Sequence, residues 1–522
     1  MTKTLRSYVE GSWHEAQSGF VPLVDPSTEE EIGRASTLGL DFAAALAWAR
    51  DKGGPALREM TIAERGALLK AASKALRDHR DELLELSRRN NGTTVADGAF
   101  DIDGATGTLA YYASVARGLG DRKTLVEGDG IQLSRSEGFW GQHLLVPKRG
   151  VAVHINAFNF PAWGFAEKAA CALVAGMPVI TKPATATALV AERCVEIIVQ
   201  ADLLPAGALQ LVSGSTGNLL DLMGPQDVLA FTGSATTAQG LRRRENLLAA
   251  NTRFNVEADS LNAAILGPSV LAGTATMTLF LDDVVREMTQ KAGQKCTAVR
   301  RILVPADRLE TVQRALEERL GDVVTGNPAG DGVTMGPLAT AAQLEDAVQG
   351  VAELRAEAEL VFGSGERIDG VGAEPGRGYF IGPTLLRTQD AHGAVEVHQR
   401  EVFGPVATLL AYDGTAAGAA EINALAGGTL VTSIYDDEPV WIGELVSRVG
   451  STTGRIYVGS EGAAAEAPGS GVTLPQTLHG GPGRAGGGEE LGGLLGVKLY
   501  MQRVALQGSR AMVEDLAGHQ AE

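Results

Sequence analysis

Polar residues that could do chemistry follow five short apolar runs in the middle of the chain. Each run has the length and composition of a buried strand, and helix-length segments separate the runs. The carboxyl ends of parallel strands meet at one edge of a sheet, so the residues after them are expected to share a ligand crevice. In chain order these residues are Asn159, Lys182, Gly214, Gly233 with Ser234, and Glu257. This set combines an amide, an ammonium, two glycine turns and a carboxylate. Together these groups predict a binding site.

Two of these features suit a phosphate or a ribose. Gly233 and Ser234 open a helix, where backbone N–H groups can bind a phosphate or simply be capped. Lys182 follows an apolar strand, where its ammonium can bind ribose hydroxyls or phosphate, or merely be solvated. The one G-x-G-x-x-G match, at residues 481–486, lacks a strong preceding strand and a later acidic partner. We therefore expect no dinucleotide-binding loop there.

The three cysteines differ in their surroundings. Cys171 and Cys194 lie in apolar helical segments and are expected to be buried packing residues. Cys296 instead follows a helix at a glycine-containing break, with Lys295 and Arg300 nearby to favour a thiolate. From the local sequence alone, Cys296 fits either a reactive or an inert thiol. The eight histidines include no HxxxH pair and the cysteines no CxxC, so no metal site is expected.

The elements that must position these residues alternate between strand and helix. The expected strands are residues 151–155, 178–181, 209–212, 228–231 and 253–256. The expected helices are residues 162–175, 186–200, 218–222 and 235–249. This alternation predicts an α/β fold with a parallel sheet covered by helices on both faces.

Other segments complete the prediction. Residues 62–90 carry apolar side chains at helical spacing, and a second α/β pattern follows residue 257. Its expected helices are residues 276–291, 309–320 and 342–358, and its expected strand is residues 301–304. Residues 131–148 are polar and alternating, which predicts a projecting hairpin.

The composition limits the possible partners. Of 522 residues, 44% are hydrophobic and 21% charged, as in ordinary globular proteins. The net charge of −18 and the aromatic content of only 5% argue against nucleic acid and anionic lipid as partners. The longest apolar run, residues 169–180, is too short to span a membrane. Three cysteines do not make a disulfide framework, and the N-terminus lacks an apolar signal core, so a cytoplasmic location is expected.

Six short motifs, taken together and in order, resemble the aldehyde dehydrogenase superfamily over nearly the whole chain. They are Phe158-Asn159-Phe160-Pro161, Lys182-Pro183, Phe231-Thr232-Gly233-Ser234, Gly293-Gln294-Lys295-Cys296, Glu401-Val402-Phe403-Gly404-Pro405 and Glu490-Leu491-Gly492. The resemblance implies a Rossmann-type cofactor domain (1–130 and 151–257) and an α/β catalytic domain (258–455). It also implies an oligomerisation arm with a C-terminal return segment (131–150 and 456–522).

The resemblance also implies roles for individual residues. Cys296 would be the nucleophile that attacks the aldehyde, and the Asn159 amide would hold the oxyanion. Glu257 would activate water to hydrolyse the thioester, and Glu490 would relay protons. The implied nicotinamide-cofactor residues are Lys182, Thr185, Gly214, Gly233, Ser234, Glu401 and Phe403, with Glu401 on the nicotinamide ribose.

Two segments depart from the common family pattern. Glu257 is followed by Ala-Asp-Ser-Leu-Asn in place of Leu-Gly-Gly-Lys, and residues 479–490 read HGGPGRAGGGEE. Both resemble a branch that oxidises CoA-linked semialdehydes in aerobic aromatic degradation. Some members, in phenylacetate degradation, are fused to a hydratase. A chain ending at Glu522 leaves no room for one, so we expect a free-standing enzyme of benzoate degradation.

The cofactor preference is expected to be NADP, with NAD as the weaker alternative. Three residues after the lysine, many NAD-preferring members carry a glutamate, and here the residue is Thr185. A carboxylate there would repel a 2′-phosphate, whereas a hydroxyl can donate to it, with Lys182 as a counter-charge.

Three other functions fit part of this residue set. A CoA-acylating dehydrogenase usually lacks the base glutamate, so Glu257 favours hydrolysis to a free acid. A cysteine thioesterase or acyltransferase would explain Cys296 but not the parallel sheet with Lys182 and Ser234 at its edge. A structural relative, like the lens crystallins, would not need the full set of catalytic residues.

The quaternary structure is expected from the same resemblance. Residues 131–148 and the strand-like residues 500–505 resemble the family's oligomerisation elements, which favours a homodimer and allows a tetramer. The basic run at residues 242–244 is a solvated helix face or a contact for CoA.

Overall fold

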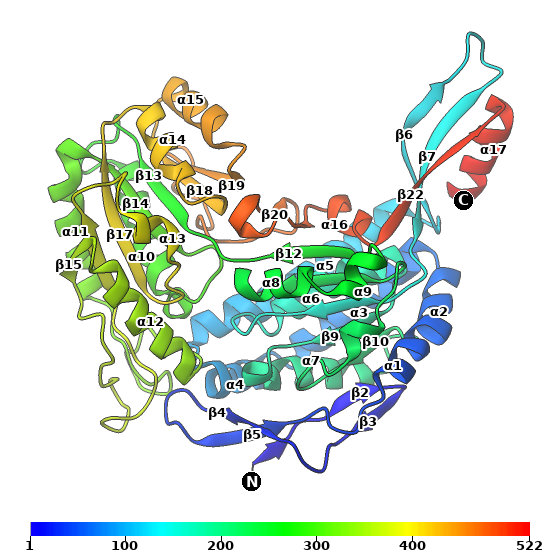
Figure 1. Cartoon of the computed structure of the whole chain (residues 1–522), viewed down its shortest axis with the longest axis horizontal. Coiled ribbons are helices and arrows are strands. Elements are labelled where there is room, and N and C mark those ends of the chain that lie inside the picture. Colours follow the sequence, from blue (N-terminus) through cyan, green and yellow to red (C-terminus); the bar gives the residue numbers. More distant parts are fainter. Residues whose placement is uncertain (1, 522) are drawn as a thin grey trace.

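Two seven-stranded sheets organise the chain, and the computed structural model describes residues 2–521 (Figure 1). The expected outer bounds at residues 1 and 522 lie outside the described residues. The first sheet has the strand order β12-β11-β8-β9-β10-β2-β3. Its strands are β12 (Arg253–Glu257), β11 (Val228–Thr232), β8 (Ala152–Ile155), β9 (Val179–Lys182), β10 (Leu209–Leu211), β2 (Ser7–Val9) and β3 (Ser12–His14).

The five strands expected at the centre of this sheet are confirmed. From β12 to β10 they run parallel, and β2 and β3 add an antiparallel edge. Strands buried on both faces read as continuous apolar runs, which is why their bounds could be predicted to within one residue. The helices between them are α6 (Trp163–Ala175), α7 (Ala188–Gln200), α8 (Ala235–Arg242) and α9 (Glu245–Ala249), with a short 3₁₀ turn at Leu219–Leu222.

Two of the expected helices are broken. Residues 62–90 form α3 (Ile62–Asp78) and α4 (Arg80–Asn91), because the backbone leaves the helical region at His79. Residues 235–249 form α8 and α9, because Arg244 is extended. The guanidinium of Arg242 binds the carbonyl of Gly486, and Arg244 pairs with Asp221. These contacts bring in distant segments, so helical periodicity could not predict the break.

The N-terminal part packs on the first sheet. A small sheet of β1 (Lys3–Thr4), β5 (Glu31–Ala35) and β4 (Val21–Val24) precedes the helices. The helices before α3 are α1 (Phe42–Trp48) and α2 (Gly54–Glu59), and α5 (Val95–Leu119) follows α4. Helix α5 packs against α3 and α6, and their buried apolar side chains share one core.

The second sheet has the order β15-β16-β17-β14-β13-β18-β19 and is parallel except for β15. Its strands are β15 (Ala358–Phe362), β16 (Thr384–Thr388), β17 (Val406–Tyr412), β14 (Val299–Pro305), β13 (Asn262–Leu266), β18 (Thr429–Tyr435) and β19 (Thr453–Gly459). Its helices are α10 (Ala275–Thr289), α11 (Leu309–Gly321), α12 (Ala341–Leu354), α13 (Val395–Gln399), α14 (Ala416–Ala424) and α15 (Pro439–Val449).

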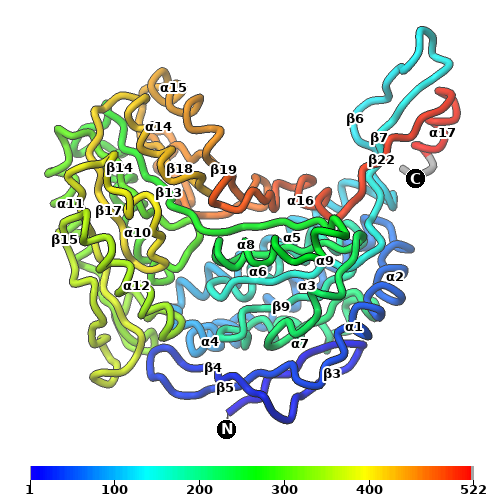
Figure 2. The backbone as a smooth tube through the Cα atoms, viewed as in Figure 1, coloured from blue at the N-terminus to red at the C-terminus, as the bar shows by residue number. Residues whose placement is uncertain are grey.

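The C-terminal segment returns from the second sheet to the first (Figure 2). It contains β20 (Leu478–Gly480), β21 (Glu489–Leu491), α16 (Leu494–Lys498), β22 (Met501–Gly508) and α17 (Arg510–Ala521). Strand β22 pairs with the projecting hairpin of β6 (Leu125–Gln132) and β7 (Trp140–Pro147), from Met501 opposite Pro147 to Gly508 opposite Trp140. Among residues 2–521, none of the helices is apolar and long enough to cross a bilayer.

Candidate active site

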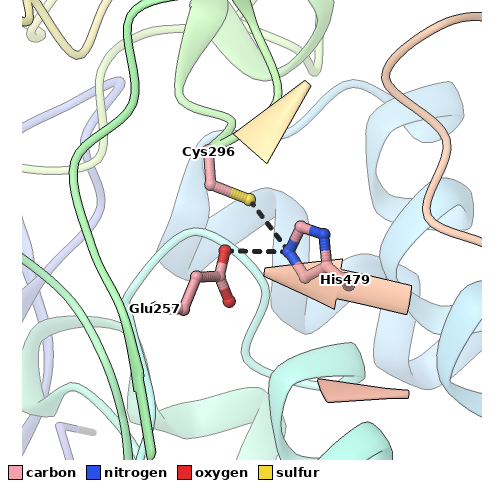
Figure 3. A group of neighbouring side chains, drawn as sticks. All are labelled: Glu257, Cys296 and His479. Atoms are coloured by element: carbon pink, nitrogen blue, oxygen red, sulfur yellow. Dashed lines mark hydrogen bonds and ion pairs between the residues drawn. The ribbon is translucent and has the colours of Figure 1, made fainter. Parts of the chain in front are cut away.

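Three side chains from distant parts of the chain meet in one pocket (Figure 3). Glu257 is the last residue of β12, Cys296 follows a short turn after α10, and His479 lies in β20. The Nε2 atom of His479 lies 2.9 Å from Oε1 of Glu257 and 3.8 Å from Sγ of Cys296. A thiol, an imidazole and a carboxylate in contact can generate a nucleophile and activate water.

The turn before Cys296 has an unusual backbone. Lys291 and Ala292 have φ angles of 55° and 53°, and Gly293 has a φ of 68°. A Cβ on Gly293 would lie 2.2 Å from the carbonyl oxygen of Gly404, so only glycine fits there. Non-glycine residues in the left-handed region are strained and persist only where surrounding contacts hold them.

Buried polar contacts hold this turn. The Lys291 N–H donates to Oδ1 of Asp97 over 3.1 Å, and the Nζ of Lys295 lies 2.6 Å from Glu287. Asp97 and Glu287 belong to helices α5 and α10, so the turn is held by both halves of the molecule. Cys296, which lines the pocket and is half-buried as a residue, is thereby held in place.

Asn159 lines the same pocket as Cys296 and is 6% exposed. Its Nδ2 donates one hydrogen bond to the carbonyl of Gln294 over 2.9 Å. A carboxamide has two N–H donors, so this contact fixes the side chain while leaving one N–H for a ligand. Phe100, Phe160 and Trp163 form an apolar wall of the pocket.

The pocket's electrostatics favour an ion pair beside a neutral thiol. Burial tends to raise the pKa of Glu257, but the charge and hydrogen bond of His479 outweigh it and lower the pKa to about 2. Burial tends to lower the pKa of His479, but Glu257 raises it by more. Burial raises the pKa of Cys296 well above its usual value, and the Glu257 carboxylate raises it further.

A second charged cluster lies behind Glu257. The cluster contains three glutamates, Glu167, Glu257 and Glu490. Each contributes one carboxylate oxygen, and the three oxygens lie within 4.8 Å of one another. The Nζ of Lys168 lies 2.9 Å from Glu167 and 3.1 Å from Glu490. Burial is the main cause that raises the pKa of Glu490, to about 7. The structure therefore places Glu490 next to the expected base.

The residues expected at the cofactor edge lie at the carboxyl ends of the first sheet. Lys182 ends β9, and burial lowers its pKa. Thr185 begins a 3₁₀ turn, Thr185–Thr187, and Gly214 packs against Thr37. Ser234 caps α8, but the first N–H of that helix donates to Asp259 over 2.8 Å. A phosphate at this helix would compete with that carboxylate.

Glu401 and Phe403 lie between α13 and β17, in the part of the chain built on the second sheet. The Oε1 of Glu401 is buried without a hydrogen-bond partner, 3.9 Å from Nε of Arg300. Burial raises the pKa of Glu401 to about 8. The rings of Phe403 and Phe158 meet edge to face. An unpaired buried acceptor fits a group with hydroxyl donors, such as a ribose, so these residues fit a nicotinamide cofactor.

The glycine-rich run after His479 has a packing role. Gly486 and Gly488 lie against the backbone of Val256, where a Cβ would come within 2.4 Å and 2.3 Å of the Val256 carbonyl oxygen. The Ala258 N–H also donates to the carbonyl of Ala485. The run thus holds β12, which carries Glu257. Cys171 and Cys194 are buried as expected, 3% and 0% exposed.

Comparison with known proteins identifies the family. The model of the aldehyde dehydrogenase family matches residues 13–492. The chain belongs to the aldehyde dehydrogenase family. This aldehyde dehydrogenase is 45% identical over 478 residues to a 3,4-dehydroadipyl-CoA semialdehyde dehydrogenase from Aromatoleum evansii, covering 92% of this chain and 93% of the relative. It is 26% identical over 488 residues to an α-ketoglutaric semialdehyde dehydrogenase from Bacillus subtilis, covering 90% and 93%.

The fold of the aldehyde dehydrogenase is confirmed by solved structures. A betaine aldehyde dehydrogenase point mutant from Staphylococcus aureus, in complex with NAD+, superposes with a TM-score of 0.84 at 22% identity and covers 97% of both chains. The family and the α/β fold expected from the six motifs are therefore confirmed.

His479, Glu167 and Lys168 were not among the site residues predicted from the sequence. His479 begins the glycine-rich run that marked the branch, which was the available signal. Glu167 and Lys168 are adjacent charges in the otherwise apolar helix α6, a pattern that also points to a function.

Proposed function

We propose that this aldehyde dehydrogenase oxidises 3,4-dehydroadipyl-CoA semialdehyde, or a similar CoA-linked semialdehyde, to the carboxylic acid in benzoate degradation. The 45% identity to a relative bearing that substrate's name supports the substrate class. The observation that carries the reaction is the single pocket lined by Cys296, Asn159 and Glu257. A related semialdehyde of phenylacetate degradation is the alternative substrate.

Cys296 acts as the nucleophile in this proposal. Its thiolate bonds to the aldehyde carbon and gives an oxyanion. The free N–H of Asn159 and the backbone N–H of Cys296 stabilise that oxyanion, and one such donor is typically worth about 3–4 kcal/mol. A bound nicotinamide supplies the acceptor for the hydride that leaves the carbon. The product on the protein is then a thioester of Cys296.

Glu257 acts as the base that completes the reaction. It takes a proton from water as the water oxygen bonds to the thioester carbon, and the sulfur leaves as thiolate. Glu490, within 4.8 Å, accepts the proton from Glu257. The carboxylate beside Cys296 favours hydrolysis over transfer of the acyl group to free CoA. Turnover that requires free CoA would overturn this assignment.

We propose NADP as the preferred cofactor, held by Lys182, Thr185, Gly214, Gly233, Ser234, Glu401 and Phe403. The hydroxyl of Thr185 and the ammonium of Lys182 would receive the 2′-phosphate, since neither repels an anion. The unpaired oxygen of Glu401 would accept from the nicotinamide ribose.

We also propose a homodimer. The β6–β7 hairpin projects from the body and pairs with β22, whose outward residues from Gln502 to Ala505 are exposed. A strand edge of this kind can pair with another subunit.

A substrate panel tests the proposed function. CoA-linked and free semialdehydes of equal chain length are oxidised with NADP and with NAD, and the absorbance of the reduced cofactor is followed. We expect the highest kcat/KM for the CoA-linked substrate with NADP. Equal rates for free and CoA-linked aldehydes would contradict the substrate class.

A further inference from the structure

His479 contacts both residues to which the proposed chemistry is assigned. A single atom, Nε2, lies within hydrogen-bond distance of Oε1 of Glu257 and of Sγ of Cys296 (Figure 3). A protonated Nε2 carries one hydrogen, so it donates fully to one partner at a time. The ring is almost completely buried, at 3% exposure, and water therefore competes little for that hydrogen.

The reaction needs negative charge on the two partners of His479 in turn. The nucleophile is a thiolate and the base is a carboxylate, and their ligand atoms lie within 4.8 Å of each other. A buried anion at either atom needs a hydrogen-bond donor to be stable. The Nε2 of His479 is within reach of both atoms.

The charged groups around the trio do not replace this donor. They are Glu167 and Lys168 on α6, Glu490 on β21, Arg455 on β19, Arg300 on β14, and Glu401. The guanidinium of Arg300 binds the backbone carbonyls of Gly293 and Gly404. The ammonium of Lys168 is paired with Glu167 and Glu490. The guanidinium of Arg455 binds the backbone carbonyls of Ser470 and Val472. These cations are thus held by other groups, and none of the acidic groups can donate to a thiolate as an anion, so the donor at the sulfur is His479.

We propose that His479 is a positioning residue whose Nε2–H donates alternately to Glu257 and to Cys296 during the reaction. The inference rests on the proposed function and deepens it. In the resting enzyme the N–H donates to the Glu257 carboxylate, the 2.9 Å contact seen here. The S–H bond of Cys296 then breaks, its electron pair stays on the sulfur, and the proton passes to Glu257. The Nε2–H turns to the new thiolate.

In the second half of the reaction, the Nε2–H of His479 changes its acceptor from Cys296 back to Glu257. Once the thioester has formed, the sulfur carries no charge and no longer attracts the N–H. Glu257 gives its proton to Glu490, which releases it to solvent before the proton from water arrives, and the Nε2–H returns to Oε1 of the restored carboxylate. The other oxygen, Oε2, accepts a bond of 3.3 Å from Thr232 and is the one left to take a proton from water. His479 ends with the proton it began with.

Alkylation of Cys296 tests this inference without cofactor or aldehyde. The rate of iodoacetamide labelling is measured against pH for wild type, His479→Phe and His479→Gln, with Cys296→Ala as the background. Phenylalanine keeps a planar ring without a donor, and glutamine keeps an N–H without charge. We expect labelling at pH 7 to fall at least tenfold in His479→Phe and its pH midpoint to rise, with His479→Gln in between. His392→Gln, at an exposed histidine, should match wild type.

A wild-type labelling midpoint in His479→Phe would overturn the inference. In His479→Ala, added imidazole should restore labelling, and failure to do so would also count against it. Wild-type oxidation of the CoA-linked aldehyde is measured separately. An enzyme that lacks that activity but shows the midpoint shift would contradict the proposed function and not the role of His479 at the sulfur.

Discussion

The carboxylate of Glu257 and the imidazole of His479 form a buried pair at 2.9 Å, although 222 residues separate them in the chain. The pair joins the last residue of β12 to the C-terminal return segment. Each partner shifts the pKa of the other toward the charged form, against the effect of burial.

This pair predicts a pH window for stability. The pKa of Glu257 falls from 4.5 to about 2 on folding, so its contribution is present above pH 4.5 and is lost as the pH falls toward 2. The pKa of His479 rises above 6.5, so its contribution is complete below pH 6.5 and is lost at higher pH. Replacing Glu257 by Gln should lower the free energy of unfolding by about 3 kcal/mol between these values. A loss that is constant from pH 3 to 9 in denaturant titrations would contradict the pair.

The cofactor preference is tested at Thr185. A carboxylate in Thr185→Glu would repel the 2′-phosphate and accept from the ribose hydroxyls of NAD. We expect the ratio of kcat/KM for NADP to that for NAD to fall by at least tenfold, about 1.4 kcal/mol. Thr185→Ser keeps the hydroxyl and should keep the ratio. A higher kcat/KM with NAD in the wild type would overturn the preference itself.

The raised pKa of Glu490 predicts how kcat depends on pH. This pKa is raised to about 7, so Glu490 can accept a proton from Glu257 only above that pH. The wild-type kcat should therefore rise through pH 7 when hydrolysis is rate-limiting. Glu490→Gln should lower kcat roughly 100-fold and remove that rise, while thioester formation stays fast. A rise that persists in Glu490→Gln would show that another group relays the proton.

The turn before Cys296 predicts that alanine destabilises the protein more at Gly293 than at Gly372. Gly293 and Gly372 have similar φ angles, 68° and 72°, but a Cβ on Gly372 would meet no atom within 4 Å. Alanine at Gly372 should cost only the backbone strain, about 1 kcal/mol. Alanine at Gly293 adds a clash with the backbone of Gly404 and should lower the free energy of unfolding by at least twice as much. Equal losses of unfolding free energy, measured by chemical denaturation, would show that the turn rearranges to accommodate the methyl group.

Local patterns in the sequence, apolar runs and short motifs, predicted much of the fold and part of the candidate active site. The five parallel strands were predicted because each is a continuous apolar run, and Asn159, Glu257 and Cys296 stood in short motifs. The helix breaks at His79 and Arg244 were missed because distant contacts and the backbone outweigh periodicity. His479 was missed because its contact with Cys296 spans 183 residues, and no local spacing reveals such a contact.

The central claim is that Cys296 carries the acyl group and Glu257 removes it. The most direct test mixes Glu257→Gln with NADP and the CoA-linked semialdehyde, and follows reduced cofactor and intact protein mass together. We expect one equivalent of reduced cofactor in a first turnover that is slower than in the wild type, because glutamine at position 257 cannot take the thiol proton. No steady-state turnover should follow, and an acyl mass should lie on the peptide that contains Cys296. Cys296→Ala should give neither reduced cofactor nor an acyl mass. Full turnover in either variant, or an acyl group on another residue, would contradict the account.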